Sequence, residues 1–130
     1  MVCLDIKKDI FGREYAYINS GKTATKFSAT EASSLMEKMG AGEIILQSIN
    51  HDGVMKGFNL KLLRSIADNV SVPTIALGGA GDLDHMLEAY SSSNISAIAC
   101  GSSFVYQDEE RGVLINYPSK DELRLFKDLR

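Results

Sequence analysis

Two small-residue loops in this chain could bind an anion. Gly78, Gly79 and Gly81 follow the apolar run 74–77, and an acidic, helix-compatible segment comes next. A buried parallel strand passes into a helix through such a tight loop, which presents bare backbone N–H groups at the helix N-terminus. A second loop, Gly101-Ser102-Ser103, follows the apolar run 97–100. One glycine loop alone is as compatible with a plain turn, but two at successive strand ends favour a phosphate site.

Two carboxylates also follow predicted strands. Asp5 comes after the apolar run 2–4, and Asp52 lies in the polar turn 50–53 that follows the run 43–49. A carboxyl group at the point where a strand leaves an apolar core can have a raised pKa and take part in proton transfer. Each also has a plainer explanation, because a strand-end Asp often caps a turn and Asp-Gly is a strong turn signal. The residues alone leave both explanations open.

A scaffold of alternating strands and helices must position these loops. Amphipathic periodicity predicts helices over about 29–39, 59–69 and 83–90, and buried strands over 2–4, 43–49, 73–77 and 97–100. Ser28 and Glu31 have capping-box spacing, and Asn59 is the expected N-cap of the second helix. Leu35, Met36 and Met39 are expected to point inward from the first helix. Strands alternating with helices predict a parallel sheet with right-handed crossovers.

The segments outside these units are less regular. The long first connection is expected to hold turns and one short exposed strand at 14–18, and long loops in compact domains are usually functional or mobile. Beyond the fourth strand we expect an irregular stretch, 106–118, and a last helix capped at Ser119.

This order predicts an α/β fold, the C-terminal half of a (β/α)8 barrel. Four βα units make half of such a barrel, and the polar and glycine features fall at the carboxyl ends of strands, where barrels carry their active sites. A flavodoxin-like open sheet follows the same strand-end rule and is the alternative. We expect residues 1–130 to form a single half-barrel domain, with 106–130 as a divergent C-terminal segment. A strand that opens the chain suggests a fragment or a domain that begins in mid-architecture.

The composition limits the cellular location and the classes of partner that we expect for this chain. The net charge of −3, with both signs dispersed, argues against nucleic acid or an anionic membrane as a partner. Runs of membrane-spanning length and a signal peptide are missing, so we expect a cytoplasmic protein. Cys3 and Cys100 are expected to be buried, reduced thiols, and His51 and His85 surface residues. Without a Cys/His cluster at ligand spacing, neither a metal nor another cofactor is expected.

In its motifs the chain resembles the cyclase subunit of imidazole glycerol phosphate synthase, a (β/α)8 barrel of histidine biosynthesis. The resemblance is to the C-terminal half of that barrel, in order and at the family's spacing. It is carried by the segments VCLD (2–5), NSGK (19–22), GAGEI (40–44), NHDG (50–53), VPTIALGGAG (72–81) and AIACGS (97–102).

The resemblance implies an activity and roles for individual residues. The family uses ammonia from a glutaminase partner, docked at the N-terminal face, to cleave and cyclise a bisphosphorylated ribulosyl-aminoimidazole carboxamide. The products are imidazole glycerol phosphate and aminoimidazole carboxamide ribotide. Asp5 matches one of the two aspartates that act as general acid and base. The matches to the phosphate and substrate sites are Gly53, Gly78, Gly79, Gly101 and Ser102, with Asp52 beside them, and the substrate-side loop Ser20, Gly21 and Lys22.

The departures from the family pattern leave two branches open. The other catalytic aspartate and the second phosphate site belong to the N-terminal half, so the isolated chain is not expected to be active. We expect it to pair with an N-terminal half barrel or with a second copy of itself. The chain has Gln47 where the histidine-pathway enzymes usually have a small hydroxyl residue. It has Asn50 where they have Asp, and Val54 where they have Thr. Residues 112–118 resemble the branch of surface-polysaccharide synthesis, whose cyclase-like subunits relay ammonia to a nucleotide-sugar amidotransferase.

Overall fold

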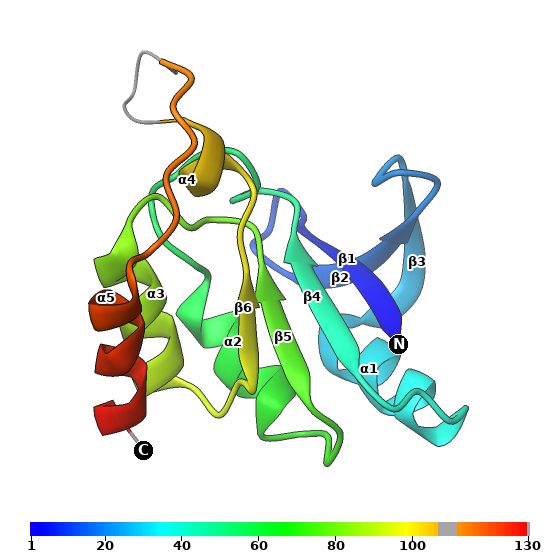
Figure 1. Cartoon of the computed structure of the whole chain (residues 1–130). Helices are drawn as coiled ribbons and strands as arrows, with labels where there is room; N and C mark the ends of the chain where they lie inside the picture. Colours follow the sequence, from blue (N-terminus) through cyan, green and yellow to red (C-terminus); the bar gives the residue numbers. More distant parts are fainter. Residues whose placement is uncertain (107–111, 130) are drawn as a thin grey trace.

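A six-stranded mixed sheet organises the molecule (Figure 1). The computed structural model describes residues 1–106 and 112–129. Four strands run parallel: β1 (Val2–Lys8), β4 (Ile44–Ser48), β5 (Thr74–Leu77) and β6 (Ala97–Ala99). An antiparallel hairpin, β2 (Glu14–Ile18) and β3 (Thr23–Ser28), extends the sheet from β1.

The order of the parallel strands decides between the two predicted folds. They lie in the sheet as β1-β4-β5-β6, so each parallel strand is added beside the one before it. A flavodoxin-like sheet instead places its first strand between the second and the third, which creates a switch point. Successive addition is the order of a βα barrel. The predicted half barrel is therefore confirmed, as an open sheet that does not close, and the flavodoxin-like alternative is wrong.

The crossover helices begin and end where local chemistry predicts. They are α1 (Ala29–Lys38), α2 (Leu60–Ala67) and α3 (Leu83–Ser92). Ser28 and Glu31 form the predicted capping box, and the side chain of Asn59 accepts the N–H of Leu62 at 3.2 Å. Gly40 follows the last turn of α1 with φ +94°, a value that favours glycine.

The C-terminal part of the described chain holds three short helical turns. They are α4 (Ser102–Val105), α5 (Lys120–Arg124) and the 3-10 turn η1 (Leu125–Leu129). The capping box predicted at Ser119 is present, with Glu122 as its partner. The ring of Phe126 packs edge-on against Tyr90 of α3, which ties this segment to the βα units. Part of the predicted irregular stretch, 107–111, lies outside the described residues.

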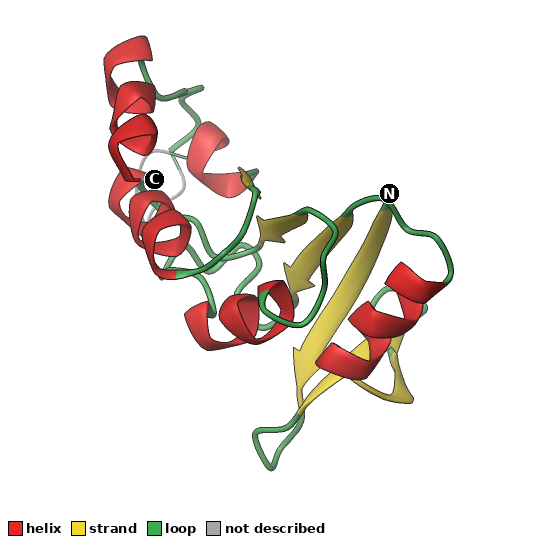
Figure 2. Ribbon diagram, turned by 90° about the horizontal axis from the view of Figure 1, so that it is seen from below, coloured by secondary structure: helices red, strands yellow, loops and turns green. Residues whose placement is uncertain are grey.

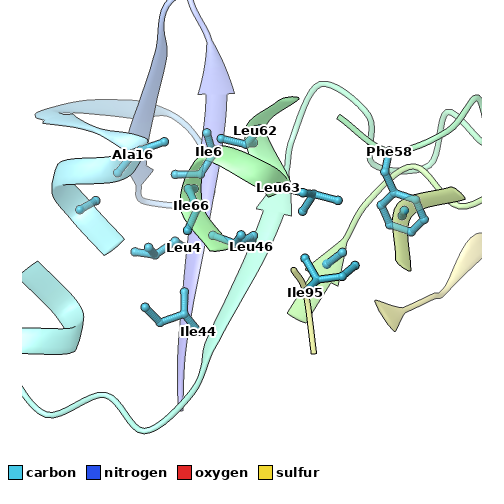
Figure 3. Packing of buried hydrophobic residues seen from close by; sticks show 14 of the residues in the cluster. Leu4, Ile6, Ala16, Ile44, Leu46, Phe58, Leu62, Leu63, Ile66 and Ile95 are labelled. Atoms are coloured by element: carbon cyan, nitrogen blue, oxygen red, sulfur yellow. The ribbon is translucent and has the colours of Figure 1, made fainter. Parts of the chain in front are cut away.

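One face of the parallel sheet forms the core, and Figure 3 shows its packing. Alternate residues such as Leu4, Ile44 and Leu46 are buried against Leu62 and Ile66 of α2. Seen from below, the sheet and the crossover helices make two layers (Figure 2). The opposite face, which we call the open face, carries the other set of alternate residues, which are half-buried or exposed: Cys3, Asp5, Ile45, Gln47, Ile75, Leu77, Ala97 and Ala99.

The structure corrects the prediction for the N-terminal strand. β1 does not end at Asp5 but continues to Lys8, because β2 pairs with its second half from Asp5↔Tyr17 to Lys8↔Glu14. Asp5 therefore lies within the strand. The long first connection is mostly a hairpin, whose second strand, β3, was not predicted.

Two predictions of burial are also wrong. Cys3 is exposed, because successive residues of a strand point to opposite faces and Cys3 points to the open one. Met39 is 73% exposed, since the buried residues of α1 are Ala29, Ala32 and Ser33.

The core should respond strongly to one truncation in α2. Ile66 is 0% exposed, so Ile66→Ala removes buried methyl groups and leaves a cavity, which should reduce the free energy of unfolding by about 2–5 kcal/mol. Ile10 is 93% exposed, so Ile10→Ala should change it by less than about 0.5 kcal/mol. Urea unfolding of both variants checks this. Equal effects would contradict the assignment of α2 to the core.

Candidate functional site

The loops after β4, β5 and β6 meet at the carboxyl edge of the parallel sheet. We call residues 49–59 the β4–α2 loop and residues 78–82 the β5–α3 loop. Both run from the end of a parallel strand to the N-cap of the next helix, which is Asn59 for α2 and Asp82 for α3. Parallel strands bring their carboxyl ends to one edge, so residues far apart in the sequence become neighbours there.

A polar row crosses the open face at this edge. Asp5 and Gln47 are register partners on β1 and β4, so their side chains stand side by side. Gln47 Nε2 donates to Asp52 Oδ2 at 3.1 Å, and the Cys3 thiol lies 4.0 Å from Gln47 Oε1. The neutral amide thus stands between two carboxylates. Its hydrogen bond fixes the position of the Asp52 side chain.

The cysteines near the site are not activated nucleophiles. Burial raises the pKa of the Cys3 thiol, and the negative charge of Asp5 raises it further. Burial also raises the pKa of Cys100, against a smaller opposing effect of Ser103. Both groups are therefore thiols at neutral pH, whereas nucleophilic cysteines need a lowered pKa.

Gly78 is required by the packing of two loops. A Cβ on Gly78 would lie 2.9 Å from the carbonyl oxygen of Ser48 and 3.4 Å from Asp52 Cβ. Its φ of +90° also favours glycine. Gly78 therefore places the β5–α3 loop directly behind Asp52.

Gly79 makes a second contact between the same loops. A Cβ there would lie 2.3 Å from the Gly57 carbonyl oxygen, and the Gly57 N–H donates to the Gly79 carbonyl at 2.8 Å. Gly78 and Gly79 are both buried. Because neither residue has a side chain, the backbones of the two loops can come into contact.

Gly53 brings the β4–α2 loop to the loop after β6. Its Cβ position is 4.0 Å from Ser102 Oγ, and Ser102 is the first residue of α4. Gly101 is exposed, and no described atom lies within 4 Å of the position of its Cβ. The backbone at Gly101 is thus open to a ligand, whereas at Gly78 and Gly79 it is covered.

The hairpin turn 19–22 lies beside this site. A Cβ on Gly21 would lie 2.8 Å from Ile49 Cδ1, so the turn packs on the first residue after β4. Asn19 and Ser20 both have φ of +56°, which is unusual for residues with a side chain. Ser20 and Lys22 are exposed at the turn. The structure therefore brings Gly21 into contact with the site and leaves Ser20 and Lys22 on its periphery.

The prediction that both histidines are surface residues is wrong. His51 and His85 are half-buried, and the ring of each lies against Gly57 of the β4–α2 loop. The signal that could have found them is weak, because a lone histidine in a polar turn or on a short helix carries no pattern of its own. Gln47 stood out in the sequence only as a substitution, and its bond to Asp52 depends on the fold.

Within residues 1–106 and 112–129, no three or more His, Cys, Asp or Glu side chains are grouped so as to hold a metal ion. Over the same residues, no helix has the length and apolar character needed to cross a membrane.

Comparison with known proteins identifies the family. Residues 1–110 match the family model described as histidine biosynthesis protein. The chain belongs to this family. It is 40% identical over 120 residues to a Pseudomonas aeruginosa protein provisionally named imidazole glycerol phosphate synthase subunit hisF2, covering 92% of this chain and 48% of that protein. The resemblance inferred from the motifs is thereby confirmed.

Other relatives give the same result at similar coverage. The chain is 36% identical over 107 residues to imidazole glycerol phosphate synthase subunit HisF of Chlorobaculum parvum, covering 82% of this chain and 42% of that protein. It is 37% identical over 123 residues to a Leptospira interrogans protein provisionally named imidazole glycerol phosphate synthase subunit HisF, with coverage of 94% and 48%. The chain spans about half the length of the curated relatives it matches.

Buried Gly78 and exposed Gly101 should differ in their tolerance of a methyl group. Gly78→Ala must strain a backbone with φ of +90° and displace Ser48, so it should lower the free energy of unfolding by roughly 1–3 kcal/mol. Gly101→Ala meets open space at φ −121° and should leave stability nearly unchanged. Denaturant unfolding of the matched pair decides. A stable Gly78→Ala protein would contradict the described loop contact.

Proposed function

We propose that this chain forms the C-terminal half of the cyclase subunit of imidazole glycerol phosphate synthase in histidine biosynthesis. The reaction uses glutamine-derived ammonia to convert the ribulosyl-aminoimidazole carboxamide bisphosphate into imidazole glycerol phosphate and aminoimidazole carboxamide ribotide. The observation that carries the proposal is the row of Asp5, Gln47 and Asp52 at the carboxyl edge of the sheet in a chain of this family. A barrel enzyme uses that edge for catalysis.

Asp5 is the residue we assign to proton transfer. It is half-buried on the open face, inside a strand, so its position is fixed by the sheet rather than by a loop. A carboxyl group held in this way can act as general acid or base on a substrate that lies across the face. Gln47 lies between Asp5 and Asp52, as register partner of the first and hydrogen-bond donor to the second.

The loops beside this row would hold one phosphate group of the substrate. Gly101 and Ser102 would supply backbone and hydroxyl donors, Gly53 approaches them from the β4–α2 loop, and Gly78 and Gly79 pack behind Asp52 and Gly57. Ser20, Gly21 and Lys22 would contact the substrate from the hairpin turn. Lys22 is the cation of that turn. The second phosphate requires a site that another half barrel must provide.

The open face determines the partners. Ile45, Ile75 and Leu77 are only half-buried there, although parallel sheets are normally covered on both faces. We therefore propose that an N-terminal half barrel, or a second copy of this chain, covers the face. A glutaminase subunit would deliver ammonia to the assembled barrel. We place the assembly in the cytoplasm, with residues 1–130 as one domain.

A second candidate function follows from the C-terminal segment. Residues 112–129 lie beyond the region that matches the family model, and their apolar side chains are unusually exposed: Val113 by 74%, Ile115 by 73% and Tyr117 by 68%. Exposed apolar patches often mark protein interfaces. The chain could therefore act in a cyclase-like scaffold that relays ammonia to a nucleotide-sugar amidotransferase in surface-polysaccharide synthesis.

One substitution tests the enzymatic proposal. The full chain, mixed with the separately produced N-terminal half of a relative, should convert the ribulosyl intermediate in the presence of ammonium. Because Asp5 transfers a proton, Asp5→Asn should reduce kcat by roughly 10²- to 10⁴-fold. Asp84→Asn, an exposed carboxylate on α3, is the matched control and should leave kcat unchanged.

The outcomes separate the two candidates. Turnover that is unaffected by Asp5→Asn, or no turnover with the wild-type chain, would contradict the cyclase proposal. Without turnover, a glutaminase that binds the mixture and becomes active would support the scaffold.

A further inference from the structure

The two loops that frame the candidate phosphate site are joined almost entirely through their backbones. Gly57 N–H donates to Gly79 O, and a Cβ on Gly81 would lie 2.2 Å from the carbonyl oxygen of Met55. Neither loop is a regular element, and glycine-rich backbone has high conformational freedom when it is not held. A side chain that reaches both loops would therefore restrict the β5–α3 loop further.

His85 is such a side chain, on the first turn of α3. Its Nδ1 accepts the N–H of Gly81 at 3.3 Å, within the β5–α3 loop. The same ring lies over Gly57 of the β4–α2 loop, with Cδ2 3.3 Å and Nε2 3.5 Å from the position of a Gly57 Cβ. One side chain thus reaches both loops: it accepts a hydrogen bond from Gly81 in one and occupies the space beside Gly57 that a side chain would need in the other.

The rigid base for this contact is the N-terminus of α3. Asp82 Oδ1 accepts the backbone N–H of His85 at 2.8 Å, which fixes the turn that carries the ring. An N–H donor can approach Nδ1 only if that nitrogen has its lone pair free. The ring proton of neutral His85 is therefore on Nε2. Asp82 Oδ1 also lies 3.2 Å from Nδ1 and would accept a hydrogen bond from it only if Nδ1 carried a proton, in the other neutral tautomer or in the imidazolium.

His51 holds the other side of the same loop. Its Nδ1 is 3.0 Å from the carbonyl oxygen of Gly57, and because a carbonyl only accepts, His51 must be the donor. Gly57 is therefore held by His51 at its carbonyl and by Gly79 at its N–H, and the ring of His85 fills the space where a Cβ of residue 57 would lie.

We propose that His85 is a positioning residue for the candidate phosphate site, which locks the β5–α3 loop against the β4–α2 loop through Gly81 and Gly57. The identity of the ligand, phosphate, rests on the proposed function. The contact of His85 with the two loops does not. A binding loop that is ordered before the ligand arrives avoids the entropy loss of ordering it on binding. Loss of the lock should therefore weaken phosphate binding without removing any group that touches the phosphate.

Amide hydrogen exchange in the full chain measures the lock directly. His85→Phe keeps an aromatic ring over Gly57 but has no acceptor, so exchange at the Gly81 N–H should become roughly 3- to 10-fold faster. His85→Asn restores an acceptor oxygen near the position of Nδ1 and should recover most of the protection. Glu88→Gln, an exposed change on the same helix, should have no effect. Unchanged exchange at Gly81 in His85→Phe, or no recovery in His85→Asn, would overturn the proposal.

The wild-type protein offers a test that needs no variant. The imidazole ¹⁵N shifts of His85 in its neutral form should show a proton on Nε2 and a free lone pair on Nδ1. A neutral ring with its proton on Nδ1 would exclude the bond from Gly81 and overturn the lock, even if a variant failed to fold.

Titration with inorganic phosphate then separates the lock from the proposed ligand. Phosphate should shift the amide signals of Gly53 and Ser102 in the wild-type chain, with roughly 3- to 10-fold weaker affinity in His85→Phe and recovery in His85→Asn. If the wild-type chain does not respond to phosphate, the proposed ligand is wrong. The hydrogen-exchange rates at Gly81 then decide whether His85 holds the two loops together. If it responds and His85→Phe binds equally well, the positioning role is wrong although the phosphate site stands.

Discussion

Parallel sheets need cover on both faces, and this sheet has helices on one of them. The crossover helices bury Leu4, Ile44 and Leu46, while the open face exposes Cys3 and leaves Ile45 half-buried. The residues suited to chemistry lie on that same open face. Under the proposed function, the surface that a second half barrel would cover also carries Asp5, so completing the barrel would complete the site as well.

The carboxyl edge depends on contacts between backbones. Gly78 and Gly79 are buried where the loops after β4 and β5 touch, so they shape the site from behind. Gly101 and Ser102, at the start of α4, leave backbone and hydroxyl groups accessible, and Gly53 approaches them from the β4–α2 loop. The glycine series therefore divides into residues that allow loop packing and residues that leave room for a ligand.

Local signals predicted the parallel units, and contacts distant in sequence explain what was missed. Strand periodicity and caps such as Ser28 and Asn59 depend on neighbouring residues, so they could be found from the sequence. The hairpin partner β3 is polar and irregular, and its pairing with β2 extended β1 past Asp5. The exposure of Cys3 and the contacts of Gln47 and His85 depend on which face or loop lies opposite. The role proposed for Asp5 came from family resemblance, not from periodicity.

The central claim is that a second half barrel covers the open face, and the reactivity of Cys3 tests it most directly. Cys3 is exposed on that face, and Cys100 beside α3 serves as an internal reference. Site-resolved labelling with a thiol reagent, at an alkaline pH that offsets the raised pKa of Cys3, should show steady modification of Cys3 in the dilute chain. Labelling of Cys3, but not of Cys100, should slow strongly when the chain is concentrated or an N-terminal half is added. Labelling of Cys3 at the same rate under all these conditions would contradict the account.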